Sequence, residues 1–108
     1  LQENLSSYAF NDDEPRKAMS HLFTESNYVA APHGAVGYLG LKKYQELHPD
    51  TQGIFLETAH PVKFLDVVKE TLGIDVAIPP QIEKVLHKTK HSIKIATYHE
   101  LKSYLLER

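Results

Sequence analysis

The chain has 108 residues, of which 42% are hydrophobic and 24% charged, and its formal net charge is −2. It is long enough for one hydrophobic core, and the balanced charge excludes the basic surface of proteins that bind nucleic acid or membranes. The absence of cysteine excludes disulfides and thiolate metal sites and fits a reducing compartment, so we expect a cytoplasmic protein.

The start of the sequence suggests that the chain is a piece of something longer. The chain begins at Leu1, and its one methionine is Met19. No apolar stretch approaches the roughly 18 residues that span a bilayer, and no signal peptide opens the sequence. We therefore expect residues 1–108 to be part of a larger protein.

The first two elements are predicted to be a strand and a helix. Residues 5–10 form a short aromatic run typical of a strand. Asn11 or Asp12 can cap the helix that follows, and Asn27 is a plausible end for it. Its apolar residues recur at i, i+3 and i+4 and predict one buried face. They are Ala18, Met19, Leu22 and Phe23.

A second helix is predicted from Pro32 to about Leu47. It carries three evenly spaced glycines, Gly34, Gly37 and Gly40, each of which costs about 1 kcal/mol relative to alanine. Two interpretations remain open: tight packing of the helix against a sheet, or room for a flat cofactor. Its predicted apolar positions are Val36, Leu39, Tyr44 and Leu47.

Residues 53–57 are predicted to be the best-buried strand of the chain. A third helix follows from Pro61 to Leu72, and Gly73 is placed to end it. Its predicted inward positions are Phe64, Leu65, Val68 and Leu72.

The last third of the chain continues the alternation. We predict a connector at 74–80, a short helix at 81–88, an edge strand at 92–97 and a terminal helix at 98–108. In the terminal helix we expect Leu101, Tyr104 and Leu105 to face inward. Short strands that alternate with helices favour an α/β fold.

The turn after residues 53–57 is the best candidate for a binding site. In open α/β sheets, ligands lie beyond the carboxyl ends of strands, where the next helix presents free N–H groups. The hydroxyl of Thr58 can donate or accept, so it can bond a neutral ring nitrogen without forcing its protonation. The alternative is that Thr58 or His60 only caps the helix that Pro61 begins.

Two histidines beside prolines, His33 and His60, raise the possibility of a metal site. Glu57 is the one carboxylate close to them in the sequence. Zinc sites need three or four ligands at readable spacing, so we expect no metal.

Two segments resemble threonine synthase. "YVAAPHGAVGYLGLKKY", residues 28–44, is similar to the family's Pro-His-x-Ala-Val-Gly helix start. "GIFLETAHPVKFLDVV", residues 53–68, is similar to its Thr-Ala-His-Pro-x-Lys-Phe signature. Their order and separation also fit. The resemblance is good over residues 5–74, and residues 75–108 are expected to be a C-terminal helical extension.

The resemblance implies a fold, a reaction and a site. It implies the C-terminal portion of a larger α/β catalytic domain of fold type II (tryptophan synthase β-like) that uses pyridoxal phosphate. Such a lyase converts O-phosphohomoserine and water to L-threonine and phosphate in threonine biosynthesis. Thr58 matches the hydroxyl residue that bonds the pyridine nitrogen, Ala59 and His60 would shape the same wall, and His33 would lie near cofactor or substrate.

The sequence departs from the family pattern in two ways. Relatives often carry an acidic residue at the position of Ala31. The lysine that forms the Schiff base, with its Ser-Phe-Lys-Asp motif, and the glycine-rich phosphate loop do not occur in the 108 residues. We therefore expect the chain alone to be inactive and to self-associate through exposed apolar faces.

Two alternatives stay open. One is a portion of another fold-type II enzyme, such as a threonine dehydratase-like protein, although the Thr-Ala-His-Pro string argues against it. The other is a non-catalytic α/β module for binding or oligomerisation.

Overall fold

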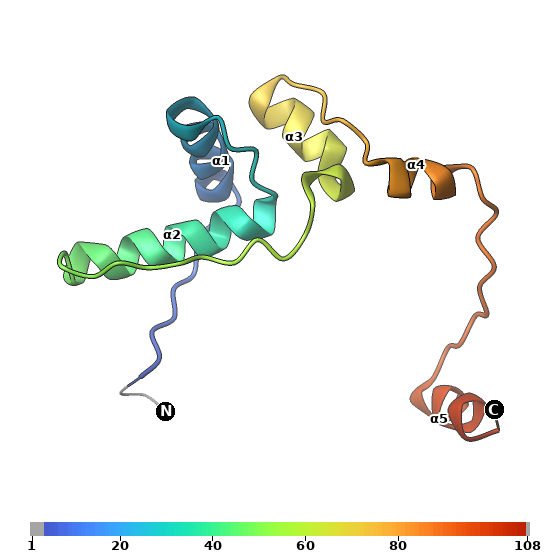
Figure 1. Ribbon diagram of the computed structural model, residues 1–108. Helices are drawn as coiled ribbons and strands as arrows, with labels where there is room; N and C mark the ends of the chain where they lie inside the picture. The colour runs from blue at the N-terminus through green and yellow to red at the C-terminus, as the bar shows by residue number, and fades with distance from the viewer. Residues whose placement is uncertain (1–3, 108) are drawn as a thin grey trace.

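The computed structural model describes residues 4–107, and helices make up the regular secondary structure of this range (Figure 1). The elements are α1 (Asp13–Ser26), α2 (Pro32–Leu47), the 3₁₀ turn η1 (Pro61–Phe64), α3 (Leu65–Leu72), α4 (Pro80–Leu86) and α5 (Tyr98–Leu106). Within the described range, no helix is long and apolar enough to cross a membrane.

The predicted α/β fold is wrong. Residues 4–107 contain no β-strand, and the three predicted strands at 5–10, 53–57 and 92–97 are extended segments outside any sheet. Alternating side chains show which residues share a face of an extended segment, whereas a strand also requires a neighbour that pairs with its backbone. These segments find no such neighbour among the described residues.

The segment 53–57 keeps the alternation of a strand but buries only one side. It runs back along α2 (Figure 1), with Phe55 and Glu57 partly buried. Ile54 and Leu56 point the other way and are 90% and 74% exposed. The predicted burial of this segment is therefore wrong for its second face.

The core lies where α1 packs against α2 and α3. Met19 of α1, Ala35 of α2 and Val68 of α3 are fully buried, and Ala18 is 5% exposed. On α2 the small residues around Ala35 face the core, because they let the helices approach closely. Of the larger positions predicted to face it, Leu39 packs against the core, whereas Val36 and Leu47 are 42% and 68% exposed.

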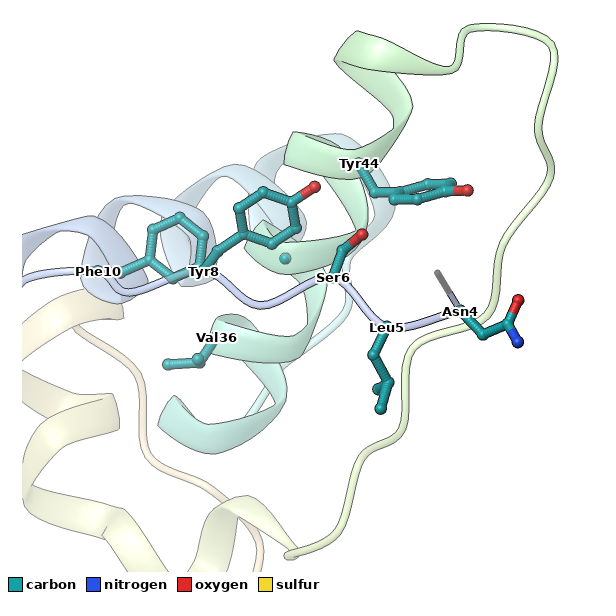
Figure 2. Close-up of a pocket in the computed structure, with 8 residues that line it drawn as sticks. Asn4, Leu5, Ser6, Tyr8, Phe10, Val36 and Tyr44 are labelled. Carbon is teal, nitrogen blue, oxygen red and sulfur yellow. The ribbon is translucent and has the colours of Figure 1, made fainter. Parts of the chain in front are cut away.

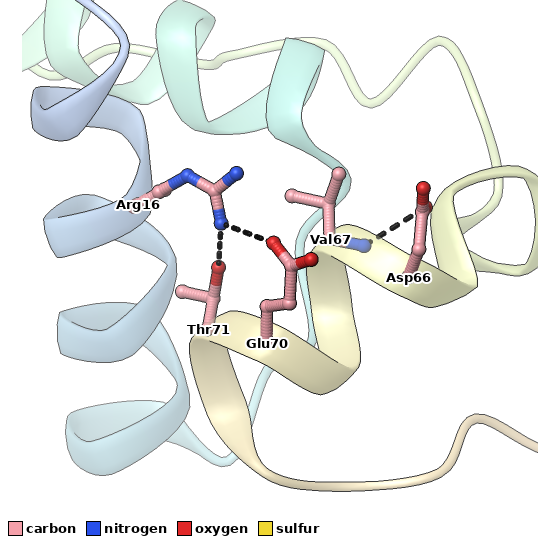
Figure 3. A network of polar contacts seen from close by, with 5 residues as sticks. All are labelled: Arg16, Asp66, Val67, Glu70 and Thr71. Atoms are coloured by element: carbon pink, nitrogen blue, oxygen red, sulfur yellow. Dashed lines mark hydrogen bonds and ion pairs between the residues drawn. The ribbon is translucent and has the colours of Figure 1, made fainter.

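A polar contact also joins α1 to α3. Arg16 donates from Nη1 to Glu70 Oε2 and to Thr71 Oγ1, each at 3.2 Å (Figure 3). Figure 3 also shows Asp66 accepting the N–H of Val67 at the start of α3. The Arg16–Glu70 pair is exposed, so it contributes about 0–1 kcal/mol and mainly sets how the two helices face each other.

The predicted helix ends are largely confirmed. Asn11 Oδ1 accepts from the N–H of Asp13 at 3.1 Å, so Asn11 caps α1, while Asp12 makes no side-chain cap. Asn27 ends α1 at φ 51°, and Gly73 ends α3 at φ 69°, both in the left-handed region. The helix that begins at Pro61 starts as a 3₁₀ turn before it becomes α3.

The chain as a whole is open. A compact domain of this length has a radius of gyration of about 13 Å, whereas the chain has 18.9 Å. A compact protein of 12.3 kDa exposes about 6,100 Å², and the chain exposes 9120 Å². Neither α4 nor α5 has a buried residue, and the predicted inward positions Leu101 and Leu105 are 41% and 59% exposed.

Met19 is the position at which we test the core, because it is one of the largest fully buried side chains of the described range. We expect Met19→Ala to lower the free energy of unfolding by about 2–5 kcal/mol, because it leaves a cavity where α1 meets α3. Guanidinium unfolding, monitored by circular dichroism, measures this free energy of unfolding. Leu106→Ala, at a side chain that is 75% exposed, is the control and should change it by less than about 0.5 kcal/mol. Equal effects of the two substitutions would contradict this core.

Candidate functional site

The three evenly spaced glycines of α2 (Gly34, Gly37 and Gly40), which we call the glycine row, lie on the helix along which the segment 53–57 returns. A Cβ on Gly34 would overlap the carboxylate of Glu57. A Cβ on Gly37 would lie 3.8 Å from the Cβ of Phe55, which is ordinary contact. Gly34 therefore leaves space for a carboxylate. The close approach of the helix and the segment explains why glycines occupy positions 34 and 37.

The turn that follows this segment borders a pocket of about 580 Å³. Thr58 and His60 are exposed and Ala59 is half-buried, and all three line it. The other wall residues are Tyr28, Val29, Glu57, Pro61, Val76 and Ala77. The structure thus brings three of the four predicted site residues together.

His60 also caps the turn that follows it. Its Nδ1 accepts the N–H of Val62 at 3.1 Å. His60 therefore does cap this turn, as the capping alternative predicts. Thr58 makes no such bond among residues 4–107, and its hydroxyl remains available to a ligand in the pocket.

His33 lies in a different pocket. This hollow of about 310 Å³ is bordered by α1, α2 and the start of α3, and Arg16 and Phe64 are among its walls. The rings of His33 and Phe64 are 5.0 Å apart and tilted by 47°. His33 and Thr58 thus belong to neighbouring segments but to separate pockets.

A third hollow, of about 550 Å³, lies between the N-terminal segment and α2 (Figure 2). Tyr8 and Phe10 line it from one side, and Val36 and Tyr44 from the other. A Cβ on Gly40 would lie 4.0 Å from the ring of Tyr8, so the last glycine of the row also permits close packing. None of the wall residues of this hollow is charged, so it offers little chemistry.

Two further observations bear on the chemistry of these sites. Across residues 4–107 no three histidine, aspartate or glutamate side chains gather closely enough to hold a metal ion. A hydrogen bond to Glu46 raises the pKa of Lys43. Lys43 lies on the exposed face of α2 and lines none of the three pockets.

Comparison with known proteins gives a consistent answer. Residues 34–105, two thirds of the chain, match the family model described as "Threonine synthase, C-terminal". The chain is 37% identical over 75 residues to the threonine synthase of Escherichia coli K12, covering 69% of this chain and 17% of that protein. It is 30% identical over 106 residues to the threonine synthase of Serratia marcescens, covering 96% and 24%.

The chain belongs to the threonine synthase family. It also superimposes on the crystal structure of threonine synthase from Escherichia coli with a TM-score of 0.82 and 29% identity, over 99% of this chain and 24% of that one. The chain therefore spans about a quarter or less of the length of these relatives. Its open shape resembles the shape of the matching segment inside a protein about four times as long.

The two threonine synthase motifs of this chain are in direct contact. The carboxylate of Glu57 accepts the N–H of Ala31 at 3.2 Å, and the rings of His33 and Phe64 meet nearby. The first turn of the Pro-His motif and both sides of the Thr-Ala-His-Pro motif are thus held together.

Sequence reasoning missed part of the pocket wall. Tyr28 stands at the start of a matched motif, but nothing in its spacing indicates a role. Val76 and Ala77 come from the stretch predicted only as a connector. Connectors lack a periodic pattern, so no signal of this kind could have placed them beside Thr58.

Substituting the two glycines tests the fit between α2 and the returning segment. Gly37→Ala should stabilise the chain by about 0.5–1 kcal/mol, because alanine favours helix and meets no obstacle there. Gly34→Ala should lose this gain and destabilise by about 1–2 kcal/mol, since it displaces the Glu57 carboxylate from its hydrogen bond. Denaturant unfolding of both variants measures the difference, and an equal gain from each would contradict the fit.

Proposed function

We propose that this chain forms one wall of the active site of a threonine synthase, at the edge of the pyridine ring of pyridoxal phosphate. The complete protein would convert O-phosphohomoserine and water to L-threonine and phosphate. The observation that supports this most directly is the exposed hydroxyl of Thr58, presented to a pocket by a turn that is fixed on both sides. Family membership supports the choice of reaction.

The walls of the pocket fit the ring. A pyridine ring needs apolar surface around it and one hydrogen-bonding group at its nitrogen. Val29, Ala59 and Val76 supply apolar surface, and Thr58 supplies the hydroxyl. The carboxylate that borders the pocket, on Glu57, is engaged with α2, so a hydroxyl is left to meet the ring edge.

The residue type at position 58 decides the electronics of the contact. Bound pyridoxal phosphate supplies an electron-withdrawing ring that stabilises negative charge on the bound amino acid. Thr58 can donate its O–H to an unprotonated ring nitrogen, whereas a carboxylate there would favour the protonated, charged nitrogen. His60 keeps its ring against the turn through Val62 and limits the space beside Thr58.

His33 has a looser place in the proposal. It borders the neighbouring pocket with Phe64, so we do not assign it a contact with the ring nitrogen. We propose that it lies near the substrate.

The remaining walls would come from the part of a threonine synthase that this chain does not contain. The chain covers only 24% of the solved relative, and its Ile54 and Leu56 side chains are largely exposed. An exposed apolar surface of this kind is consistent with a surface that another part of a larger protein covers. The motif of the cofactor's lysine lies outside the 108 residues, so the chain alone should not retain the cofactor.

The first test compares the chain alone with a chimera. In the chimera, this chain replaces the matching quarter of the Escherichia coli enzyme. We expect the chimera to bind pyridoxal phosphate stoichiometrically, seen by its visible absorbance after dialysis, and to release phosphate from O-phosphohomoserine. The chain alone should retain no cofactor.

Three outcomes would contradict this proposal. They are stoichiometric retention of cofactor by the chain alone, a folded chimera that retains none, and a chain whose exposed face serves only for self-association. The last would appear in sedimentation as a stable oligomer that the rest of the enzyme does not dissociate.

The second test addresses Thr58 in the same chimera. Thr58→Val keeps the shape of the side chain and removes the hydroxyl, so turnover should fall about 5–150-fold, equivalent to about 1–3 kcal/mol. Thr58→Ser should retain most activity, and Thr24→Val, on the exposed face of α1, is the matched control. Wild-type turnover in Thr58→Val would show that this hydroxyl does not meet the ring.

A further inference from the structure

The start of α2 lacks a local cap. Ala31 occupies the N-cap position and has no side chain that can accept a hydrogen bond, and no acidic residue follows in the first turn. Pro32 has no N–H, but the amides of Ala31, His33 and Gly34 have no partner within the helix. Such a helix start needs an acceptor from elsewhere.

Glu57 supplies that acceptor from 26 residues away in the sequence. Its Oε2 accepts the N–H of Ala31 at 3.2 Å, and its carboxylate fills the space that Gly34 leaves open. Its Oε1 is buried and has no hydrogen-bond partner in the described range. A negative charge at this end of α2 is favoured by the helix dipole, so the carboxylate is suited to this place.

The same contact fixes the turn that carries the site. Glu57 immediately precedes Thr58, while Pro61 is buried and Phe64 meets His33. The exposed residues Thr58 and His60 therefore lie between two fixed points, the Glu57 contact before them and the packed residues Pro61 and Phe64 after them. Earlier in the segment, Phe55 packs against the rings of Tyr28 and Tyr38. Glu57 therefore makes the anchoring contact nearest to Thr58 on that side of the turn.

We propose that Glu57 is a positioning residue, whose carboxylate ties the Thr58–His60 turn to the start of α2. It does so in addition to capping the helix. Its importance for cofactor binding rests on the function proposed above, but the tether itself is a property of this chain and can be measured without cofactor.

The experiment separates capping from tethering with two substitutions. Glu57→Ala removes both roles. Adding Ala31→Asp in that background restores a cap at the N-cap position, where Asp is among the preferred residues, but it cannot restore the tether to the turn. Glu57→Gln retains an acceptor without the charge, and Glu25→Ala, at an exposed residue of α1, is the matched control.

Nuclear magnetic resonance on the ¹⁵N-labelled chain gives two readouts. In Glu57→Ala, amide exchange at Ala31 should accelerate about tenfold or more, because a bond to a charged acceptor is lost. The order parameters of Thr58 and Ala59 should fall from about 0.85 towards 0.6. In the double variant, the new carboxylate at position 31 can accept the N–H of His33 or Gly34, so exchange at these amides should become slower than in Glu57→Ala while Thr58 and Ala59 stay mobile.

Two results would overturn the tether. One is unchanged order parameters at Thr58 and Ala59 in Glu57→Ala. The other is their full recovery in the double variant, which would leave Glu57 as a helix cap only. Should Glu57→Ala fail to fold, Glu57→Gln decides: the tether requires the mobility of Thr58 and Ala59 to rise in step with amide exchange at Ala31. Wild-type order parameters together with accelerated exchange at Ala31 would refute it.

A second measurement links the tether to the cofactor. In the chimera, Glu57→Ala should weaken pyridoxal phosphate binding about tenfold, and Ala31→Asp should not restore it. A chimera that binds no cofactor at all would refute the proposed function, while the relaxation data would still decide the role of Glu57. Wild-type cofactor affinity in Glu57→Ala would refute the importance of the tether for the site.

Discussion

The contact between the first turn of α2 and residues 55–57 is the constraint on which the rest of this site depends. It brings together Ala31 and Glu57, which lie 26 residues apart in the sequence. Gly34 provides the space that the Glu57 carboxylate fills. The hydrogen bond from Ala31 to this carboxylate fixes how closely the extended segment lies against α2. Because Thr58 follows Glu57 directly, the position of the pocket wall is set by how closely the extended segment can lie against α2.

The helices could be predicted from the sequence because their signals are local. Pro32 begins α2 by pre-setting its backbone angle, and Asn27 and Gly73 end their helices by adopting left-handed angles that few residues tolerate. The strands could not be predicted in the same way. Residues 53–57 show the alternation of a strand, but a strand also requires a pairing partner, and no feature of these five residues reveals whether the chain provides one.

Locality also decides how much of the candidate site was predictable. Thr58, Ala59 and His60 are consecutive, so a single turn places them at one pocket whatever the rest of the fold does. His33 comes from another helix, and its distance from that pocket depends on how the helices pack. Val76 reaches the pocket only because the chain reverses at Gly73 after α3.

The two walls of the pocket, one carrying Thr58 and the other Val76, are held in place by different contacts. Val76 belongs to a stretch that packs against the core of α1, α2 and α3, so the position of its wall depends on the packing of that core. The Thr58 wall is tied to the start of α2 by the Glu57 hydrogen bond and by the space at Gly34. Phe55 adds aromatic contacts with Tyr28 and Tyr38. On its outer face the segment before Thr58 exposes Ile54 and Leu56. If further protein covers that face, as the proposed function requires, it would press the segment against α2 and fix Thr58 further.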